Sequence, residues 1–366
     1  MNVLHLGKFC PPKEGGIELF TYDLLEYLNN NGIKADLLGF DNITRKENYR
    51  NFQYYGCKTN YVINSAPISF DYFRIFNEIK KNYDLIHIHS PNPLAETISL
   101  SCNKNVVIHW HSDVIRQKYF YLLYKTIQKK VLDKAKVIVC TSRQYMETTL
   151  QLKQFKSKCV VIPLGLAPER LNYNNINDEN YLNDFKHKKI VLSIGRLVEY
   201  KGFEYLIDAA KYLNEDIVIF IAGTGKLYNK LQKRIQNNQL DNKVILLGTV
   251  NNISSWMKRC DLFCLPSISR NEAFGLVLVE ALYFGKPLIT TEVTGSGMNY
   301  ININGQTGLV VPPMDPGAIA NAINTILSDE SLSKKFSQNA TERFSEFEID
   351  KVGEKIKMLY EKILFG

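Results

Sequence analysis

The 366-residue chain has no uninterrupted apolar run of the ~18 residues that mark a transmembrane helix. Its first ten residues, MNVLHLGKFC, lack the basic start and the long apolar segment of a signal peptide. No GxGxxG fingerprint follows the first apolar run, and no GxxxxGK[ST] phosphate loop or Asp-x-Asp pair occurs anywhere. These absences predict a cytoplasmic protein without a dinucleotide fingerprint, a P-loop or obvious ligands for a metal-bridged diphosphate.

Cysteine is present but not in a pattern that indicates disulfides or zinc. The chain has seven cysteines, an odd number, and they are scattered. Only Cys260 and Cys264 lie close together, and no second pair stands at the spacing of a zinc ribbon. We therefore expect reduced thiols in the core or at the surface.

The net excess of positive charge lies entirely in the first half of the chain. Residues 1–170 hold 23 Lys and Arg against 15 Asp and Glu, whereas residues 171–366 hold 22 of each. The densest part includes QKYFYLLYKTIQKKVLDKAK at 117–136, a helical pattern of aromatic and Leu residues interleaved with Lys. Such a helix can bind an anionic membrane surface, or it can face the core and expose a solvated basic face. We expect peripheral membrane contact, and no nucleic acid because no recognised binding motif accompanies the charge.

Apolar runs alternate with helical patterns along two stretches of the chain. A polar, Asn-rich segment at 166–189 separates the two stretches. The expected strands lie at 2–7, 35–40, 84–89, 105–111, 136–142 and 159–165, and then at 190–195, 217–223, 244–248, 261–267, 287–292 and 308–313. Alternation of this kind predicts an α/β fold with two doubly wound, parallel-sheet (Rossmann-like) domains. Ligands are expected beyond the carboxyl ends of the strands, in a cleft that the domains face.

Two carboxylates, Glu272 and Glu280, stand in the mostly apolar segment SRNEAFGLVLVEALYFGKP at 269–287. Glu272 is expected in a strand-to-helix loop, and Glu280 on the following helix among apolar neighbours. The free N–H groups of the helix start, around 274–277, form a potential anion site. Spacing alone also allows a capping Glu272 and an exposed Glu280. A buried Glu280 would need a polar partner.

Two further loops point to the same cleft. LSIGRLVEYKGFE places Arg196 and Lys201 just past a strand, where both can reach a diphosphate, although isolated loop charges are more often simply solvated. Gly15 and Gly16 directly precede the first expected helix, where the backbone can approach a ligand closely.

Histidines occur in two i, i+2 pairs, IHIH at 86–89 and IHWH at 108–111. Alternation along a strand places each pair on one face, so four imidazoles could bind zinc. The alternative, which we favour, is that His111 reaches the cleft while the others are hydrogen-bonded at the edge of the sheet.

Taken together, the motifs resemble those of the retaining GT-B glycosyltransferases of family 4, over essentially the full length, and within that family the bacterial O-antigen and polysaccharide enzymes. The matching parts are Gly15-Gly16, HWHSD at 109–113, GRLVEYKG at 195–202, AGTGK at 222–226, LPS at 265–267, Glu272 to Glu280, and GLVVPP at 308–313. The resemblance implies an acceptor-binding domain at 1–168 that is completed by a crossover helix within 348–366. It also implies a nucleotide-sugar-binding domain at 169–347.

The resemblance also implies roles for individual residues. Arg196 and Lys201 would hold the diphosphate, Glu272 would bind hydroxyls of the donor sugar, Glu280 would accept from the ribose, and His111 would contact the sugar near the reacting carbon. The implied catalytic set is His111, Arg196, Lys201 and Glu272, and the implied donor-binding set adds Gly15, Gly16, Ala273, Phe274, Gly275, Leu276 and Glu280. No metal or cofactor is expected. Thr224 departs from the family pattern, in which an acidic residue is common, so we assign it no role.

The implied reaction transfers a hexose, with retention, from a GDP-mannose-type donor or a UDP-hexose or UDP-HexNAc. The acceptor would be a polyprenyl-diphosphate-linked oligosaccharide or another glycan, at the inner face of the plasma membrane. Two alternatives remain at this point. One is a sugar-nucleotide 2-epimerase of the same fold, and the other is a non-catalytic nucleotide-sugar-binding protein.

Overall fold

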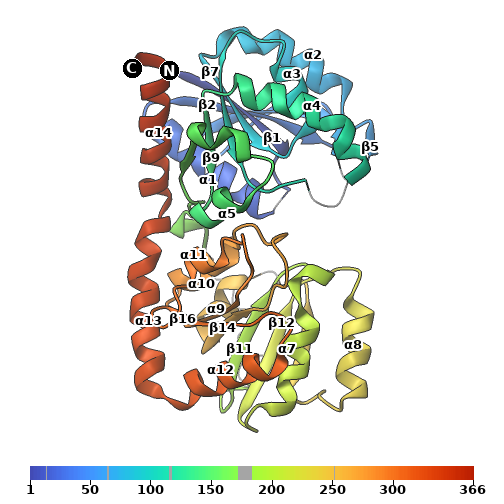
Figure 1. Ribbon diagram of the computed structural model, residues 1–366, viewed down its shortest axis with the longest axis vertical. Coiled ribbons are helices and arrows are strands. Elements are labelled where there is room, and N and C mark those ends of the chain that lie inside the picture. Colours follow the sequence, from blue (N-terminus) through green and yellow to red (C-terminus); the bar gives the residue numbers. More distant parts are fainter. Residues whose placement is uncertain (14, 64–65, 115–117, 172–183, 251) are drawn as a thin grey trace. The chain divides into compact units, whose positions relative to one another are not determined.

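The computed structural model describes residues 1–13, 15–63, 66–114, 118–171, 184–250 and 252–366, with the side chains of 118–123 excluded. The chain forms two compact units (Figure 1). Unit 1 consists of Met1–Leu166 and Phe347–Gly366, and unit 2 consists of Ala167–Glu346. Each is described separately below.

Unit 1 is built on an eight-stranded sheet in the order β10-β9-β8-β7-β1-β2-β4-β3. Its strands are β1 Asn2–Phe9, β2 Lys34–Asp41, β3 Arg45–Tyr49, β4 Phe52–Lys58, β7 Leu85–Ser90, β8 Asn105–Trp110, β9 Val137–Cys140 and β10 Cys159–Val161. All pairings are parallel except that of β3 with β4. The order reverses at β1 and β7, which is the topological switch point of this sheet.

The helices of unit 1 are α1 Gly16–Asn30, α2 Phe70–Ile79, α3 Pro93–Ser99, α4 Lys118–Lys134, α5 Arg143–Thr148 and α14 Ile349–Phe365. A short hairpin of β5 Tyr61–Ile63 and β6 Ala66–Ile68 stands apart from the main sheet. The last helix, α14, packs on α1: the Tyr27 hydroxyl donates to Glu354 Oε2 at 2.9 Å. A Cβ at Gly353 would lie 2.2 Å from the Tyr27 ring, so this close approach requires glycine.

Unit 2 is built on a six-stranded parallel sheet in the order β13-β12-β11-β14-β15-β16. The strands are β11 Lys189–Ile194, β12 Ile217–Ala222, β13 Val244–Gly248, β14 Leu262–Leu265, β15 Leu288–Thr291 and β16 Gly308–Val311. Numbered along the chain, this order is 3-2-1-4-5-6, which is that of a doubly wound nucleotide-binding fold. The switch point lies between β11 and β14.

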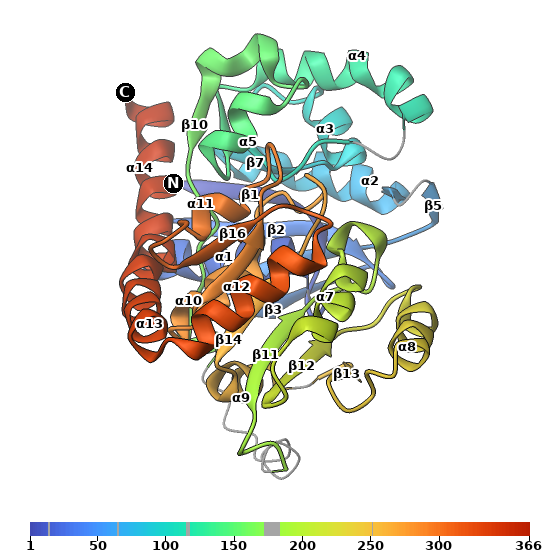
Figure 2. The same cartoon turned by 60° about the horizontal axis from the view of Figure 1, so that its bottom comes forward.

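The helices of unit 2 are α7 Phe203–Ala209, α8 Tyr228–Asn237, α9 Ile253–Arg259, α10 Leu276–Tyr283, α11 Met298–Ile301, α12 Pro316–Ser328 and α13 Glu330–Phe344. Figure 2 shows α12 lying along the sheet, and its buried residues, such as Ile319 and Ile323, join Val191, Ile219 and Ile289 in one core. The α/β class and the two doubly wound sheets that the sequence predicts are therefore confirmed.

Four strands, β3 to β6, were not predicted from the sequence. The β3 residues Lys46, Glu47 and Asn48 are exposed, because β3 is the antiparallel edge strand and carries no apolar run. Edge strands are often charged, which protects them from pairing with another chain.

Candidate functional site

The site in unit 2 begins with two loops that follow neighbouring strands at the switch point. Lys201 comes from the loop after β11, and Glu272 comes from the loop after β14. The Nζ atom of Lys201 lies 2.5 Å from Oε2 of Glu272, and their side chains are only 9% and 11% exposed. Because β11 and β14 are hydrogen-bonded neighbours, this pair lies where ligands of such folds bind.

Glycines give the Lys201 loop its shape. Gly202 has a φ of +66°, and a Cβ there would lie 2.3 Å from the Pro266 carbonyl oxygen. The amide of Ile268 donates to the Tyr200 carbonyl at 2.8 Å, which joins the two loops. A Cβ at Gly195 would lie 3.0 Å from Cε of Lys201. Gly202 therefore has to be glycine, because both its φ and its approach to the Pro266 backbone exclude a side chain, whereas a Cβ at Gly195 would press on the end of the Lys201 side chain.

The Glu272 loop is fixed by short polar contacts. Ser267 Oγ donates to Glu272 Oε2 at 3.2 Å, and Ser296 Oγ donates to the Glu272 carbonyl. The next carbonyl, that of Ala273, accepts from the Gly297 amide at 2.8 Å. Helix α10 then begins at Leu276, after Gly275 with a φ of +90°. The first N–H groups of an α-helix have no intrahelical partner, so this turn can bind an anion beside Glu272.

Glu280 lies on α10 and is buried. Its Oε1 lies 3.4 Å from Nη2 of Arg170, with both side chains about one-tenth exposed (9% and 11%). The partner that a buried carboxylate needs is thus an arginine that sequence reasoning missed. Arg170 stands in the short helical turn Pro168–Leu171, at the start of the segment that the sequence identified only as a polar linker.

The other predicted donor residues occupy different environments. Arg196 is exposed, and its Nη2 donates to the Tyr200 hydroxyl at 3.3 Å. Gly15 is the N-cap residue of α1 in unit 1, and Gly16 opens that helix just after β1. Gly15 has an extended backbone with a φ of −159°, and a Cβ there would contact only the end of the Glu18 side chain, so the structure shows no strict need for glycine at this position.

His111 follows β8 in unit 1 and is buried, with 3% of its surface exposed. Its Nε2 lies 2.9 Å from Nδ1 of His89. Burial is the main cause that lowers the pKa of His111 well below 6.5, so the imidazole is neutral. Contrary to the expectation that the other histidines are all hydrogen-bonded, His109 has no hydrogen-bond partner for either ring nitrogen among the described residues.

Comparison with known proteins identifies the family. The model of the glycosyl transferases group 1 matches residues 175–343, and that of glycosyltransferase family 4 matches residues 14–170. The O-antigen chain mannosyltransferase C of Escherichia coli is 31% identical, over 100% of this chain and 99% of its own. The chain belongs to the family 4 glycosyltransferases. A D-rhamnosyltransferase, WbpZ of Pseudomonas aeruginosa, is 29% identical over 94% of this chain and 91% of its own.

Solved structures support the GT-B fold of this glycosyltransferase. The Anabaena protein Alr3699/HepE in complex with UDP superposes with a TM-score of 0.80 at 20% identity, over 99% of this chain and 100% of its own. The sucrose-phosphate synthase of Thermosynechococcus elongatus gives the same TM-score at 22% identity, over 99% and 98% of the two chains. The resemblance that the motifs indicated is confirmed.

The basic segment of the glycosyltransferase forms α4, and its described side chains divide into two faces. Tyr124, Gln128 and Val131 are buried, whereas Lys125 and Lys129 are exposed. This part of α4 is a core-facing helix with a solvated basic face. The aromatic and Leu side chains expected at its start, 119–123, lie outside the described residues.

Proposed function

We propose that the chain is a retaining hexosyltransferase that uses a nucleotide-sugar donor, of the GDP-mannose type or a UDP-hexose or UDP-HexNAc. The observation that carries the proposal is the Lys201–Glu272 pair at the switch point of a 3-2-1-4-5-6 sheet. An ammonium group has three donors and a carboxylate has about four acceptor positions, so their mutual contact leaves both able to bind a ligand. Lys201 then faces the diphosphate, and Glu272 accepts from hydroxyls of the sugar.

Arg196 completes the diphosphate site in this proposal. Its guanidinium is exposed and rests on the Tyr200 hydroxyl, four residues along the same loop. A guanidinium binds phosphate oxygens through two parallel N–H groups, whereas Lys201 acts as a compact charge. The amides of residues 273–276 add donors at the start of α10, and Glu280, held by Arg170, accepts from the ribose hydroxyls.

The chemistry requires no protein nucleophile. The acceptor hydroxyl attacks the anomeric carbon from the face that the diphosphate leaves, and the bond from that carbon to the phosphate oxygen breaks. The departing oxygen takes the hydroxyl proton. Arg196, Lys201 and the helix start stabilise the negative charge that develops on the leaving group. Since the sequence has no Asp-x-Asp pair, we propose that these groups serve in place of a bridging cation.

We propose a lipid-linked glycan acceptor, reached at the inner face of the plasma membrane. Relatives support this: one Escherichia coli enzyme, 27% identical over 77% of this chain and 76% of its own, is named as a galactosyltransferase acting on GlcNAc-diphosphoundecaprenol. Among the described residues, no helix is long and apolar enough to cross a membrane, so contact would be peripheral.

Unit 1 offers both charge and exposed apolar side chains for such contact. It carries 26 Lys and Arg against 18 Asp and Glu, whereas unit 2 carries 19 of each. Large apolar side chains are exposed on β5 and at the start of α2: Tyr61 (63%), Val62 (64%), Phe70 (68%) and Phe73 (52%). Helix α3 contacts both α4 and β6, so the basic helix and the apolar hairpin belong to one region of unit 1.

A panel of nucleotide-sugars tests the proposed activity. Slow hydrolysis of one donor without acceptor, and transfer to a polyprenyl-diphosphate-linked oligosaccharide, would support it. Formation of an epimerised donor would identify the 2-epimerase instead. Binding without turnover, with acceptor present, would identify a non-catalytic protein.

Co-sedimentation with anionic vesicles tests membrane contact separately. We expect binding at low salt that weakens when Lys125, Lys129 and Lys130 are replaced by Glu, since surface attraction is screened over about 8–10 Å at physiological salt. Replacing the exposed unit 2 residues Lys230, Lys233 and Lys334 by Glu is the matched control. Equal binding by both variants would contradict the membrane proposal.

A further inference from the structure

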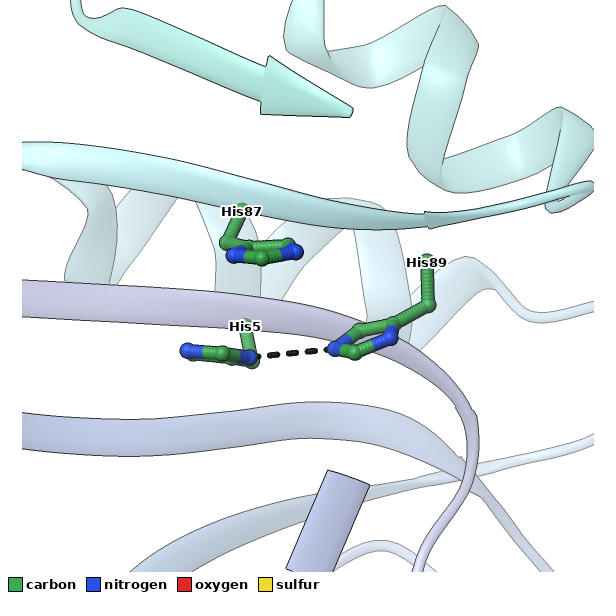
Figure 3. A group of neighbouring side chains, drawn as sticks. All are labelled: His5, His87 and His89. Atoms are coloured by element: carbon green, nitrogen blue, oxygen red, sulfur yellow. Dashed lines mark hydrogen bonds between the residues drawn. The ribbon is translucent and has the colours of Figure 1, made fainter. Parts of the chain in front are cut away.

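Five of the six histidines of the chain are buried in unit 1, at the switch point of its sheet. His5 lies on β1, His87 and His89 on β7, and His109 and His111 at the end of β8 (Figure 3 shows the first three). Neighbouring rings are stacked, with centroids 4.4 Å apart for His109 and His111 and 4.6 Å apart for His5 and His87. Burial is the main cause that lowers the pKa of each imidazole, so all five are neutral.

Three of these rings are joined head to tail. Nδ1 of His5 lies 3.0 Å from Nε2 of His89, and Nδ1 of His89 lies 2.9 Å from Nε2 of His111. A neutral imidazole has one N–H and one acceptor nitrogen. Because every link joins Nδ1 to Nε2, all three rings carry their proton on the same kind of nitrogen. The position of one proton therefore determines the others.

The contacts of Thr21, on α1, show which ring nitrogen carries the proton. Its hydroxyl donates to the Ile17 carbonyl at 2.7 Å, which uses its single proton. Nδ1 of His89 lies 3.3 Å from the same Oγ1, which can only accept there. His89 thus carries its proton on Nδ1 and donates to His111 as well as to Thr21.

The contacts of His5, at the other end of this series of hydrogen bonds, are consistent with protons on the Nδ1 atoms. If the Nδ1 atoms carry the protons, His5 Nε2 must accept, and the hydroxyl of Tyr360 on α14 lies 3.3 Å from it. Tyr360 is fully buried, and burial raises its pKa well above 10, so it keeps its proton for this bond. Its oxygen also contacts Nδ1 of His87, and in this arrangement His87 must be the donor, because the hydroxyl proton is used towards His5.

We propose that this series of hydrogen bonds fixes His111 as the Nδ1–H tautomer. His111 then presents a hydrogen-bond donor and not a base. Nδ1 of His111 is buried and has no hydrogen-bond partner among the described residues. The partner that this N–H requires is an acceptor oxygen of a bound substrate, a step that rests on the proposed function. Thr21, His5, His89 and Tyr360 are then positioning residues, because each acts only through the tautomer of His111.

A metal ion is the competing occupant. Two groups, His5-His87-His89 and His89-His109-His111, each bring one nitrogen per ring within 4.8 Å of the others. Nitrogen ligands at ~2.0–2.1 Å from a tetrahedral zinc ion lie about 3.4 Å apart. The observed separations of 2.9 and 3.0 Å are shorter and match hydrogen bonds. A metal would also leave its ligating nitrogens without protons, so the two models predict different spectra.

The test is ¹⁵N NMR of the full chain labelled at histidine. The resonances are assigned from variants in which one histidine at a time is replaced. We expect His5, His89 and His111 to be Nδ1–H tautomers. Nε2–H at His111, or a shift of these signals on adding Zn²⁺, would overturn the proposal. The spectrum is independent of turnover, so this outcome is distinguishable from a failure of the proposed function.

Two variants of one residue add a functional readout. Thr21→Val removes the acceptor and should lower the Nδ1–H fraction of His111 and reduce kcat/KM by about 3- to 10-fold, as expected for one hydrogen bond between neutral groups. Thr21→Ser retains the hydroxyl and should restore both. A loss of activity in Thr21→Val with an unchanged His111 tautomer would contradict the assignment.

Discussion

The ammonium nitrogen of Lys201 contacts the carboxylate of Glu272 at 2.5 Å, across two loops that follow adjacent strands. Both side chains are nearly buried, so each charge depends on the other for the solvation it has lost. The pair holds together the two loops that we assign to the donor. This contact gives mutations at either residue both a structural and a catalytic consequence, which experiments can separate.

Lys201→Met should destabilise unit 2 by about 3–5 kcal/mol, because it leaves the Glu272 carboxylate buried without its cation. It should also lower the transfer rate by ~10²–10³, the effect of losing one electrostatic donor to the leaving group. Urea unfolding and initial-rate assays measure the two effects.

The double variant Lys201→Met/Glu272→Gln distinguishes the effect on stability from the effect on catalysis. Removing both charges should recover most of the lost stability, since replacing a buried ion pair as a whole is often near neutral. Activity should remain as low as in the single variant. If activity returned together with stability, Lys201 would be a structural residue only.

Glu280→Gln should raise the KM for the nucleotide-sugar by about 10-fold, on the order of one charge-assisted hydrogen bond, and leave kcat nearly unchanged. Gln keeps the shape of the side chain beside Arg170 but removes its charge. A matched change of Glu292, an exposed carboxylate of unit 2, should leave KM unaltered. A fall in kcat with unchanged KM would contradict the ribose assignment.

Gly202→Ala should destabilise unit 2 more than Gly248→Ala. The two glycines have nearly the same φ, +66° and +67°, so the backbone cost of a Cβ is shared. A Cβ at Gly202 meets the Pro266 oxygen at 2.3 Å, whereas no atom of the described residues lies within 4 Å of a Cβ at Gly248. We expect roughly 1 kcal/mol for Gly248→Ala and at least 1–3 kcal/mol more for Gly202→Ala. Equal effects would show that the loop can move.

The free energy of unfolding of unit 1 should fall in mild acid. Burial lowers the pKa of its five buried histidines, that of His89 to about 3, whereas the unfolded chain titrates near 6.5. As the pH falls below about 6.5 the unfolded state binds protons that the folded state cannot, so stability present above that pH is lost. Between pH 6.5 and pH 5.5 the loss is roughly 1 kcal/mol per imidazole, or about 5 kcal/mol for the five.

The two tryptophans allow this to be measured unit by unit. Trp110 lies in unit 1 and Trp256 in unit 2, so Trp256→Phe leaves a probe of unit 1 alone. Its urea midpoint should fall steeply between pH 6.5 and 5.5, and less steeply in His109→Leu, which removes one imidazole. A midpoint that does not change over this range would contradict the burial of neutral histidines.

The sequence predicted the elements of both sheets where apolar runs were continuous, as in IVIFIA of β12, because buried parallel strands need such runs. It also placed Lys201 and Glu272 in strand-to-helix loops. Their pairing could not be read from spacing, because it depends on β11 and β14 becoming neighbours. Arg170 was missed because a single arginine in a polar segment carries no periodic signal, and no pattern connects His5 with distant His89.

The central claim is that the Lys201–Glu272 loops of unit 2 bind the diphosphate of the donor. Calorimetric titration of GDP and of UDP in the presence of EDTA tests it most directly. We predict that one of the two binds the wild-type chain and that Arg196→Gln and Lys201→Met each weaken binding at least 10-fold, while Lys189→Gln, at the opposite end of β11, does not. Binding that needs added Mn²⁺, or equal affinity in all four proteins, would contradict the account.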